Sequence, residues 1–147
     1  LHKIIEKYWN SMGWKPPSEE WALKLTILLK DSLTILKDVI EQSKPFFSVP
    51  PISQDCNEFI SNKENQESLK LISNYLKEKN IGTIDQNKAK EIINKISDKH
   101  SIKKGLLMKS LRVAFFGSLS GPDLIQSWEL FSESKSDLSR IKRCIFS

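Results

Sequence analysis

The chain has 147 residues, of which 39% are hydrophobic and 28% charged, and its formal net charge is +5. Folding a chain of this length buries roughly 70% of the surface that the unfolded form exposes, so we expect a folded domain with a core rather than a disordered segment. No apolar run approaches the roughly 18 residues of a membrane span and no signal-peptide pattern opens the chain, so we expect a cytoplasmic protein without membrane contact.

The positive charge is unevenly distributed. Residues 1–60 hold 7 Lys or Arg against 8 Asp or Glu, whereas residues 61–147 hold 16 against 10. A basic half favours phosphate backbones or anionic surfaces as partners, and the alternative is a solvated lysine-rich surface.

The sequence of the first third of the chain predicts helices. Apolar residues keep helical spacing over 4–12, and Gly13 follows where a helix commonly stops. Ser18 precedes two glutamates and is the expected N-cap of a second helix. Its apolar pattern continues to residue 40, either as an extension or as a third helix. Three prolines then predict a stiff connector over 45–52.

The rest of the chain is also read as helical. We expect a short helix over 54–61, a polar boundary at 62–66, and hence two subdomains, 1–62 and 63–147. Further helices are expected over 69–80, over 106–116 and from Pro122 to about 131, with a last one starting at Ser136. Thr83 and Gln86 have the spacing of a capping box for a helix that follows them. No segment alternates with period 2, so the predicted fold class is all-α.

The usual chemistry-bearing patterns are missing. The two histidines, His2 and His100, have no triad-like neighbours, and Cys56 and Cys144 lie far apart without ligand spacing. No glycine-rich phosphate loop occurs. We therefore expect neither catalytic residues nor a metal site in this chain. We expect the thiols of both cysteines to be reduced.

The most informative segment is 103–124, which carries Lys103, Lys104, Lys109 and Arg112 before its first acid, Asp123. On a helix, residues 109 and 112 share a face, and a guanidinium can hydrogen-bond a base edge or stack beneath it. The alternatives are that Arg112 satisfies carbonyls at the end of a helix or pairs with Asp123. Gly121-Pro122 alone is also consistent with a plain helix start.

The same segment resembles a known family signature. Lys104-Gly105, Met108, Leu111-Arg112, Ala114, Gly117 and Gly121-Pro122 are similar to the KG...LFMPLRxALTGxxxGPxL pattern of bacterial and organellar-type glutamyl-tRNA synthetases. That pattern lies in their C-terminal anticodon-binding domain. Residues 137–143 resemble the family's final helix, and residues 29–47 resemble an earlier helix pair.

The resemblance implies a two-part helical cage that grips the anticodon loop of a tRNA. It implies that Arg112 contacts the anticodon and that Pro122 and Leu124 line the base pocket. Ser32 stands where many members carry an arginine linked to reading the third anticodon base. The implied partner is glutamate tRNA, and glutamine tRNA remains open as a second partner.

The family's ATP-binding signatures, HIGH-like and KMSKS-like, do not occur in these 147 residues. The resemblance therefore implies an upstream catalytic domain that uses ATP, Mg²⁺ and glutamate, and a fragment that has no cofactor or ligase activity of its own. We expect a monomer, in the cytoplasm or in an organellar stroma or matrix. The rival interpretations are a basic helical protein-interaction module without RNA reading and a DNA-binding helical domain.

Overall fold

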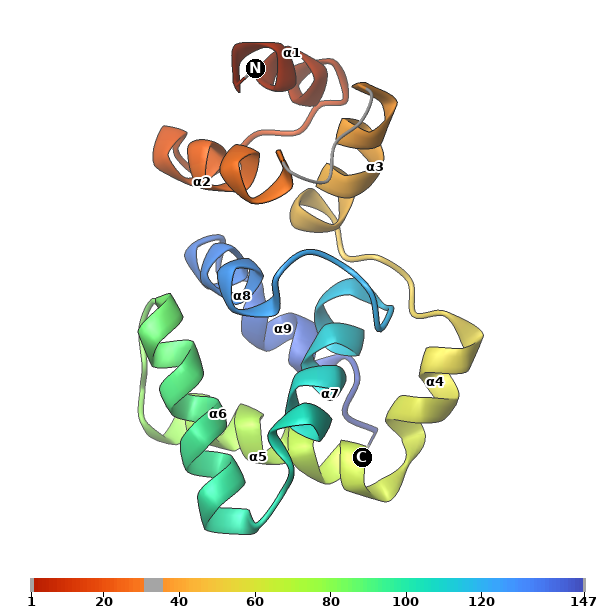
Figure 1. Ribbon diagram of the computed structural model, residues 1–147, viewed down its shortest axis with the longest axis vertical. Helices are drawn as coiled ribbons and strands as arrows, with labels where there is room; N and C mark the ends of the chain where they lie inside the picture. Colours follow the sequence, from red (N-terminus) through yellow and green to blue (C-terminus); the bar gives the residue numbers. More distant parts are fainter. Residues whose placement is uncertain (1, 31–35, 147) are drawn as a thin grey trace. The chain divides into compact units, whose positions relative to one another are not determined.

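The computed structural model describes residues 2–30 and 36–146, and its regular structure there is entirely α-helical, which confirms the predicted class (Figure 1). Ser32 lies outside the described residues. The helices are α1 His2–Ser11, α2 Glu19–Leu29, α3 Leu36–Phe47, α4 Gln54–Ser61, α5 Lys63–Glu78, α6 Gln86–His100, α7 Lys104–Phe116, α8 Leu124–Glu133 and α9 Asp137–Lys142.

The chain divides into two compact units, Leu1–Val49 and Pro50–Ser147. The boundary expected after residue 62 therefore lies inside the second unit, where α4 packs on α5 and α7. The polar run that suggested a boundary is helical, and Asn62 caps α5 by accepting a hydrogen bond from the Glu64 amide at 3.0 Å.

Two side-chain amides of that polar run are buried and donate hydrogen bonds to backbone carbonyls. The Asn65 amide donates to the carbonyl oxygen of Phe59 at 2.6 Å. Gln66 donates through Nε2 to the carbonyl oxygens of Ile60 and Cys144, both at 2.7 Å, and accepts the Phe146 amide at 2.8 Å. Buried polar groups are tolerated when they are paired in this way, so a polar sequence here joins α4, α5 and the end of the chain instead of marking a linker.

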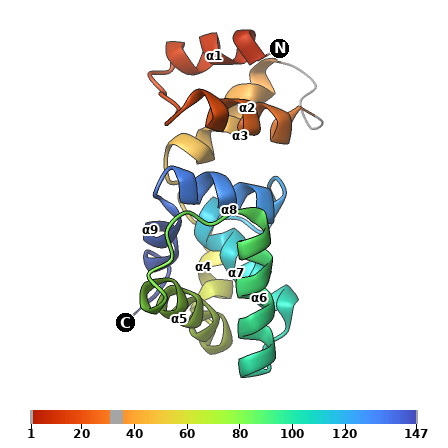
Figure 2. The ribbon, with the colours of Figure 1, turned by 90° about the vertical axis from the view of Figure 1, so that its left-hand side faces the viewer.

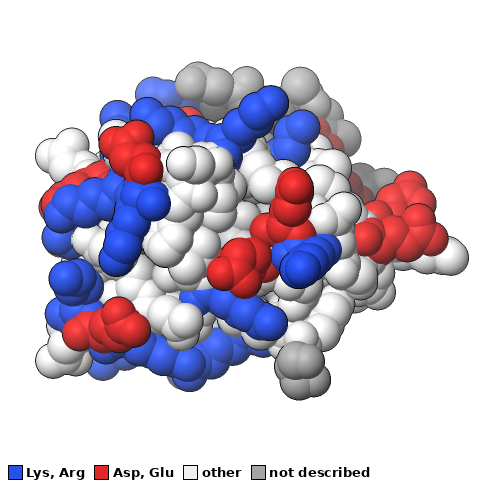
Figure 3. Space-filling model, turned by 90° about the horizontal axis from the view of Figure 1, so that it is seen from below, with Lys and Arg blue, Asp and Glu red and all other residues white. Residues whose placement is uncertain are grey.

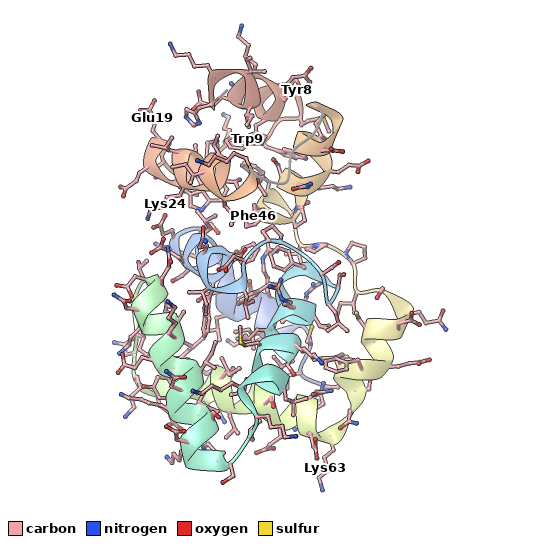
Figure 4. All side chains as sticks on the ribbon, viewed as in Figure 1. Tyr8, Trp9, Glu19, Lys24, Phe46 and Lys63 are labelled. Carbon is pink, nitrogen blue, oxygen red and sulfur yellow. The ribbon has the colours of Figure 1, made fainter. Side chains whose placement is uncertain are left out.

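An aromatic cluster holds the first unit together. The ring of Phe47 lies 5.2–5.3 Å, centroid to centroid, from the rings of Trp9, Trp14 and Trp21. Trp9 is fully buried, lies among the helices of this unit (Figure 4), and donates from its indole nitrogen to the Ser43 hydroxyl at 2.9 Å. The polar edge of the indole is thus paired, as a buried tryptophan requires.

Local signals account for most helix ends. After α1, Trp14 donates to the carbonyl of Trp9 and Gly13, with φ 77°, donates to that of Asn10, which is a Schellman motif. Ser18 caps α2 as predicted. Pro45, expected to end a helix, lies inside α3, which ends two residues later; its ring nitrogen has no N–H to donate to the carbonyl four residues earlier.

Two predicted helix starts are corrected. Asp85 caps α6 by accepting the Lys88 amide at 2.7 Å, so Thr83 and Gln86 do not form the expected capping box. Asp123 caps α8 by accepting the Gln126 amide at 2.9 Å, so Pro122 precedes the cap instead of forming the first turn. In both cases a carboxylate one or two residues further on is the better acceptor at a helix N-terminus.

Helix α7 is central to the second unit. It packs against α4, α5, α6, α8 and α9, and Figure 2 shows it lying alongside α6 with α8 crossing near its end. Its inward residues are fully buried, and the aromatic ring of Phe115 meets those of Trp128 and Phe131 at 6.0 and 5.1 Å. A helix surrounded in this way leaves only a narrow face for solvent.

Candidate nucleic-acid interface

The solvent face of α7 carries the predicted cations. Lys104 and Lys109 are exposed and Arg112 is half-buried, whereas Leu107 and Leu111 are fully buried. Residues 109 and 112 are neighbours on a helix surface, so the structure brings these two onto one face as expected. Lys103, the exposed residue before α7, lines a groove of about 840 Å³ between α5 and the start of α7, together with His100 and Ile102.

Arg112 fastens the loop that follows its own helix. Its Nη1 donates to the carbonyl oxygen of Pro122 at 2.9 Å and, more weakly, to that of Gly121 at 3.4 Å. Neither alternative from the sequence holds among the described residues, because Arg112 forms no ion pair with Asp123 and does not bond the last-turn carbonyls of α7. Its Nε and Nη2 have no hydrogen-bond partner in the described part of the chain.

That free edge has a specific chemical use. Nε–H and Nη2–H lie side by side on one edge of the guanidinium plane, and such a pair can donate to two acceptors of one base or to two phosphate oxygens. Because Nη1 is already bonded, the plane is held in place while the edge stays available. Arg112 can therefore hold the loop and still have the binding role that was predicted for it.

The loop, residues 117–123, is anchored at its other end by Gly117. Gly117 has φ +67°, and a Cβ built there would lie 2.1 Å from the carbonyl oxygen of Pro51. Its own carbonyl accepts the Ser53 amide at 3.1 Å. Only glycine allows this backbone conformation and this close approach together.

The two predicted pocket residues after the loop have different environments. Pro122 is half-buried, with a surface that a ligand can reach. Leu124 is 1% exposed and belongs to the core, so its side chain does not form an open wall and instead holds the start of α8 in place. Leu124 is thus a buried residue of α8, whereas Asp123, which caps the helix, is exposed.

Sequence analysis missed how the last turn of α7 is satisfied. Arg140, 2% exposed, donates to the carbonyl oxygen of Phe115 at 2.9 Å and lies 4.1 Å from the centre of the Phe131 ring. Arg143 donates through Nη2 to the carbonyl of Ala114 at 3.0 Å. Positive charge at a helix C-terminus is favourable, so these arginines are structural. The signal was present as two arginines three residues apart, one in α9 and one at its C-cap.

Burial lowers the pKa of both arginines. Desolvation, followed by repulsion from Arg143, lowers the pKa of Arg140 to about 10. The side chain remains protonated at neutral pH, and its carbonyl and ring contacts compensate for the lost hydration.

The described residues contain no group of three or more His, Cys, Asp or Glu side chains that could hold a metal ion. Cys56 and Cys144 are free and buried, and burial raises the pKa of the Cys144 thiol. No helix of the described part is long and apolar enough to cross a membrane. Figure 3 shows lysines and arginines interspersed with acids on the face that it presents, so the positive surface is not uniform.

The described residues form an all-helical domain in which α7 presents exposed cations next to a loop that Arg112 braces. The family model described as anticodon binding domain matches residues 1–145, and the chain therefore belongs to that family. The predicted resemblance is confirmed.

Relatives agree with this placement. The glutamate–tRNA ligase of Prochlorococcus marinus strain MIT 9312 is 67% identical over 145 residues, which are 99% of this chain and 30% of that protein. The enzyme of the same name from strain MIT 9211 is 42% identical over 143 residues, or 97% of this chain and 30% of the relative. The chain thus spans about 30% of the length of the curated relatives it matches.

Solved structures show the same fold. A glutamate tRNA ligase from Elizabethkingia meningosepticum superposes with a TM-score of 0.85 at 23% identity, covering 97% of this chain and 28% of that one. Glutamate-tRNA synthetase from Elizabethkingia anophelis gives a TM-score of 0.77 at 25% identity, covering 97% and 27%.

Proposed function

We propose that this chain binds the anticodon loop of a tRNA and belongs to a glutamate–tRNA ligase whose chemistry lies outside these 147 residues. The observation that carries the proposal is the family match over residues 1–145, together with relatives named glutamate–tRNA ligase of which the chain covers 30%. The exposed cations of α7 support it physically, because phosphate backbones supply most of the affinity for nucleic acid.

Each candidate residue has a proposed part. Arg112 holds the loop through Nη1 and offers Nε and Nη2 to an unstacked base. Lys103, Lys104 and Lys109 meet phosphates, where a flexible ammonium is sufficient. Pro122 offers an apolar surface beside the base, and Leu124 supports it from the core. Splayed single-stranded bases are recognised by such planes and walls.

The proposed partners follow from the relatives. Glutamate tRNA is the primary one, and glutamine tRNA is the competitor to test, because Ser32 replaces the arginine that many members of the family carry. A catalytic domain in the rest of the protein would use ATP and Mg²⁺ to activate glutamate, and residues of this chain take no part in that step. The proposal places the protein as a monomer in the cytoplasm, as suits an enzyme of translation, with an organellar stroma or matrix as the alternative.

The test is binding of a fluorescent glutamate anticodon stem-loop to the chain at several salt concentrations. If the three lysines meet phosphates, the logarithm of the affinity falls with that of the salt concentration, with a slope of about −2 to −3. A double-stranded DNA of equal length is the matched competitor. Equal binding of the duplex would favour a DNA-binding domain, and no RNA binding at low salt would favour a protein-interaction module.

A further inference from the structure

The middle of the α7–α8 loop holds an apolar side chain in solvent. Leu119 is 45% exposed, between the anchor at Gly117 and the carbonyls bonded by Arg112. An exposed leucine is common on protein surfaces and means little alone. The loop around this one is unusual because its backbone is fastened on both sides of the leucine.

Hydrogen bonds hold the loop on both sides of Leu119. The Ser120 amide donates to the Ser118 hydroxyl at 3.1 Å, and the two hydroxyls lie 3.0 Å apart, which closes a turn around Leu119. Beyond it, Arg112 bonds the carbonyls of Gly121 and Pro122. Leu119 therefore lies in a loop that is bonded at its far end by Arg112 of α7, the residue whose guanidinium has a free edge.

We propose that Leu119 is a further base-contacting residue, which packs against one unstacked base of the anticodon loop next to the base or phosphate bound by Arg112. This rests on the proposed function. Unstacked bases lose their neighbours in the RNA, and an apolar side chain that is already held in place replaces that contact at little entropic cost. The occupant is a base rather than a phosphate because Leu119 carries no donor and no charge.

A double-mutant cycle between the protein and the RNA tests the proposal. Leu119→Ala in the full 147-residue chain is expected to weaken binding of the glutamate anticodon stem-loop by about 5-fold and to leave the salt slope unchanged. Leu119→Met, which keeps the apolar volume, should retain most of the affinity. Phe146→Ala removes a side chain of similar exposure, 44%, at the far end of the sequence, and should have no effect.

Changes in the RNA identify the base that Leu119 contacts. Three stem-loops, each with one anticodon base replaced by an abasic site, are compared on the parent chain and on Leu119→Ala. The proposal predicts that the loss caused by Leu119→Ala disappears on one abasic RNA and persists on the other two. The proposal is overturned if Leu119→Ala binds the intact RNA as tightly as the parent chain does. It is also overturned if Leu119→Ala lowers the affinity equally for the intact RNA and the three abasic RNAs. If the parent chain binds none of them, the proposed function itself fails, whereas an effect of Arg112→Ala without one of Leu119→Ala overturns only this inference.

Discussion

Arg112 on α7 donates to the carbonyl oxygen of Pro122, ten residues further on, at 2.9 Å. This bond joins the helix that carries the exposed cations to the loop that leads into α8. It uses one nitrogen of the guanidinium and leaves an edge with two N–H groups, so one residue can shape the site and contact the ligand.

Arg112→Lys separates these two roles. A single ammonium cannot hold the loop and offer a planar pair of donors, so the affinity for the anticodon stem-loop should fall about 10-fold while the salt slope is nearly kept. Lys109→Gln is the matched comparison, since losing one phosphate contact should reduce the slope by about 0.7. Titrations at four salt concentrations measure both. If Arg112→Lys bound the stem-loop as tightly as the parent chain does, Arg112 would act only through its charge.

Gly117→Ala should destabilise the second unit. The new Cβ would meet the Pro51 carbonyl in a backbone conformation that suits glycine, and we expect a loss of about 2 kcal/mol or more in the free energy of unfolding. Gly105→Ala is the control, because nothing lies within 4 Å of its would-be Cβ and alanine favours a helix by up to about 1 kcal/mol. Denaturant unfolding checks both, and a harmless Gly117→Ala would contradict the packing described.

Gln66→Leu tests the buried junction of α4, α5 and the chain end. It removes the donor to two carbonyls and the acceptor of the Phe146 amide, and should cost about 2 to 4 kcal/mol of unfolding free energy. Gln86→Leu, at the exposed start of α6, serves as the control and should change stability by less than about 0.5 kcal/mol. A loss of stability as small as that of the control would contradict the role given to the hydrogen bonds of Gln66.

Glu91 on α6 gives a prediction on pH. Hydrogen bonding to Lys95, then to Lys88, lowers the pKa of the Glu91 carboxyl below the usual 4.5. A lowered folded pKa adds stability above pH 4.5 that is lost as the pH falls through the folded value. Lys95→Met should therefore raise the Glu91 pKa toward 4.5, measured by carbon-13 NMR titration. Lys90→Met on the same helix should leave it unchanged, and an equal shift in both variants would refute the pairing.

Much of the fold was predictable because helix signals are local. Apolar spacing and the Ser18 cap located α2, and Gly13 marked the end after α1, since each depends on residues within one or two turns. The environment of Gln66 was not predictable, because its partner at Cys144 lies far away in the sequence and is brought close only when α5 meets the end of the chain.

The candidate site was predicted in part. The shared face of Lys109 and Arg112 follows from helical geometry alone. The bond from Arg112 to Pro122 depends on the course of a loop, and the burial of Leu124 depends on where α8 starts, so neither could be read from spacing. A pattern that identifies a family marks residues that matter without separating those that touch a ligand from those that hold the site together.

The central claim is that this chain reads an anticodon, and discrimination between loops tests it most directly. We would measure the affinity of the chain for two stem-loops at the same salt concentration, identical except that one carries the glutamate anticodon and the other an unrelated triplet. The account predicts at least about 10-fold tighter binding of the glutamate loop, a preference that Arg112→Lys reduces. Equal affinities for the two loops would contradict it, because phosphate contacts alone carry no sequence information.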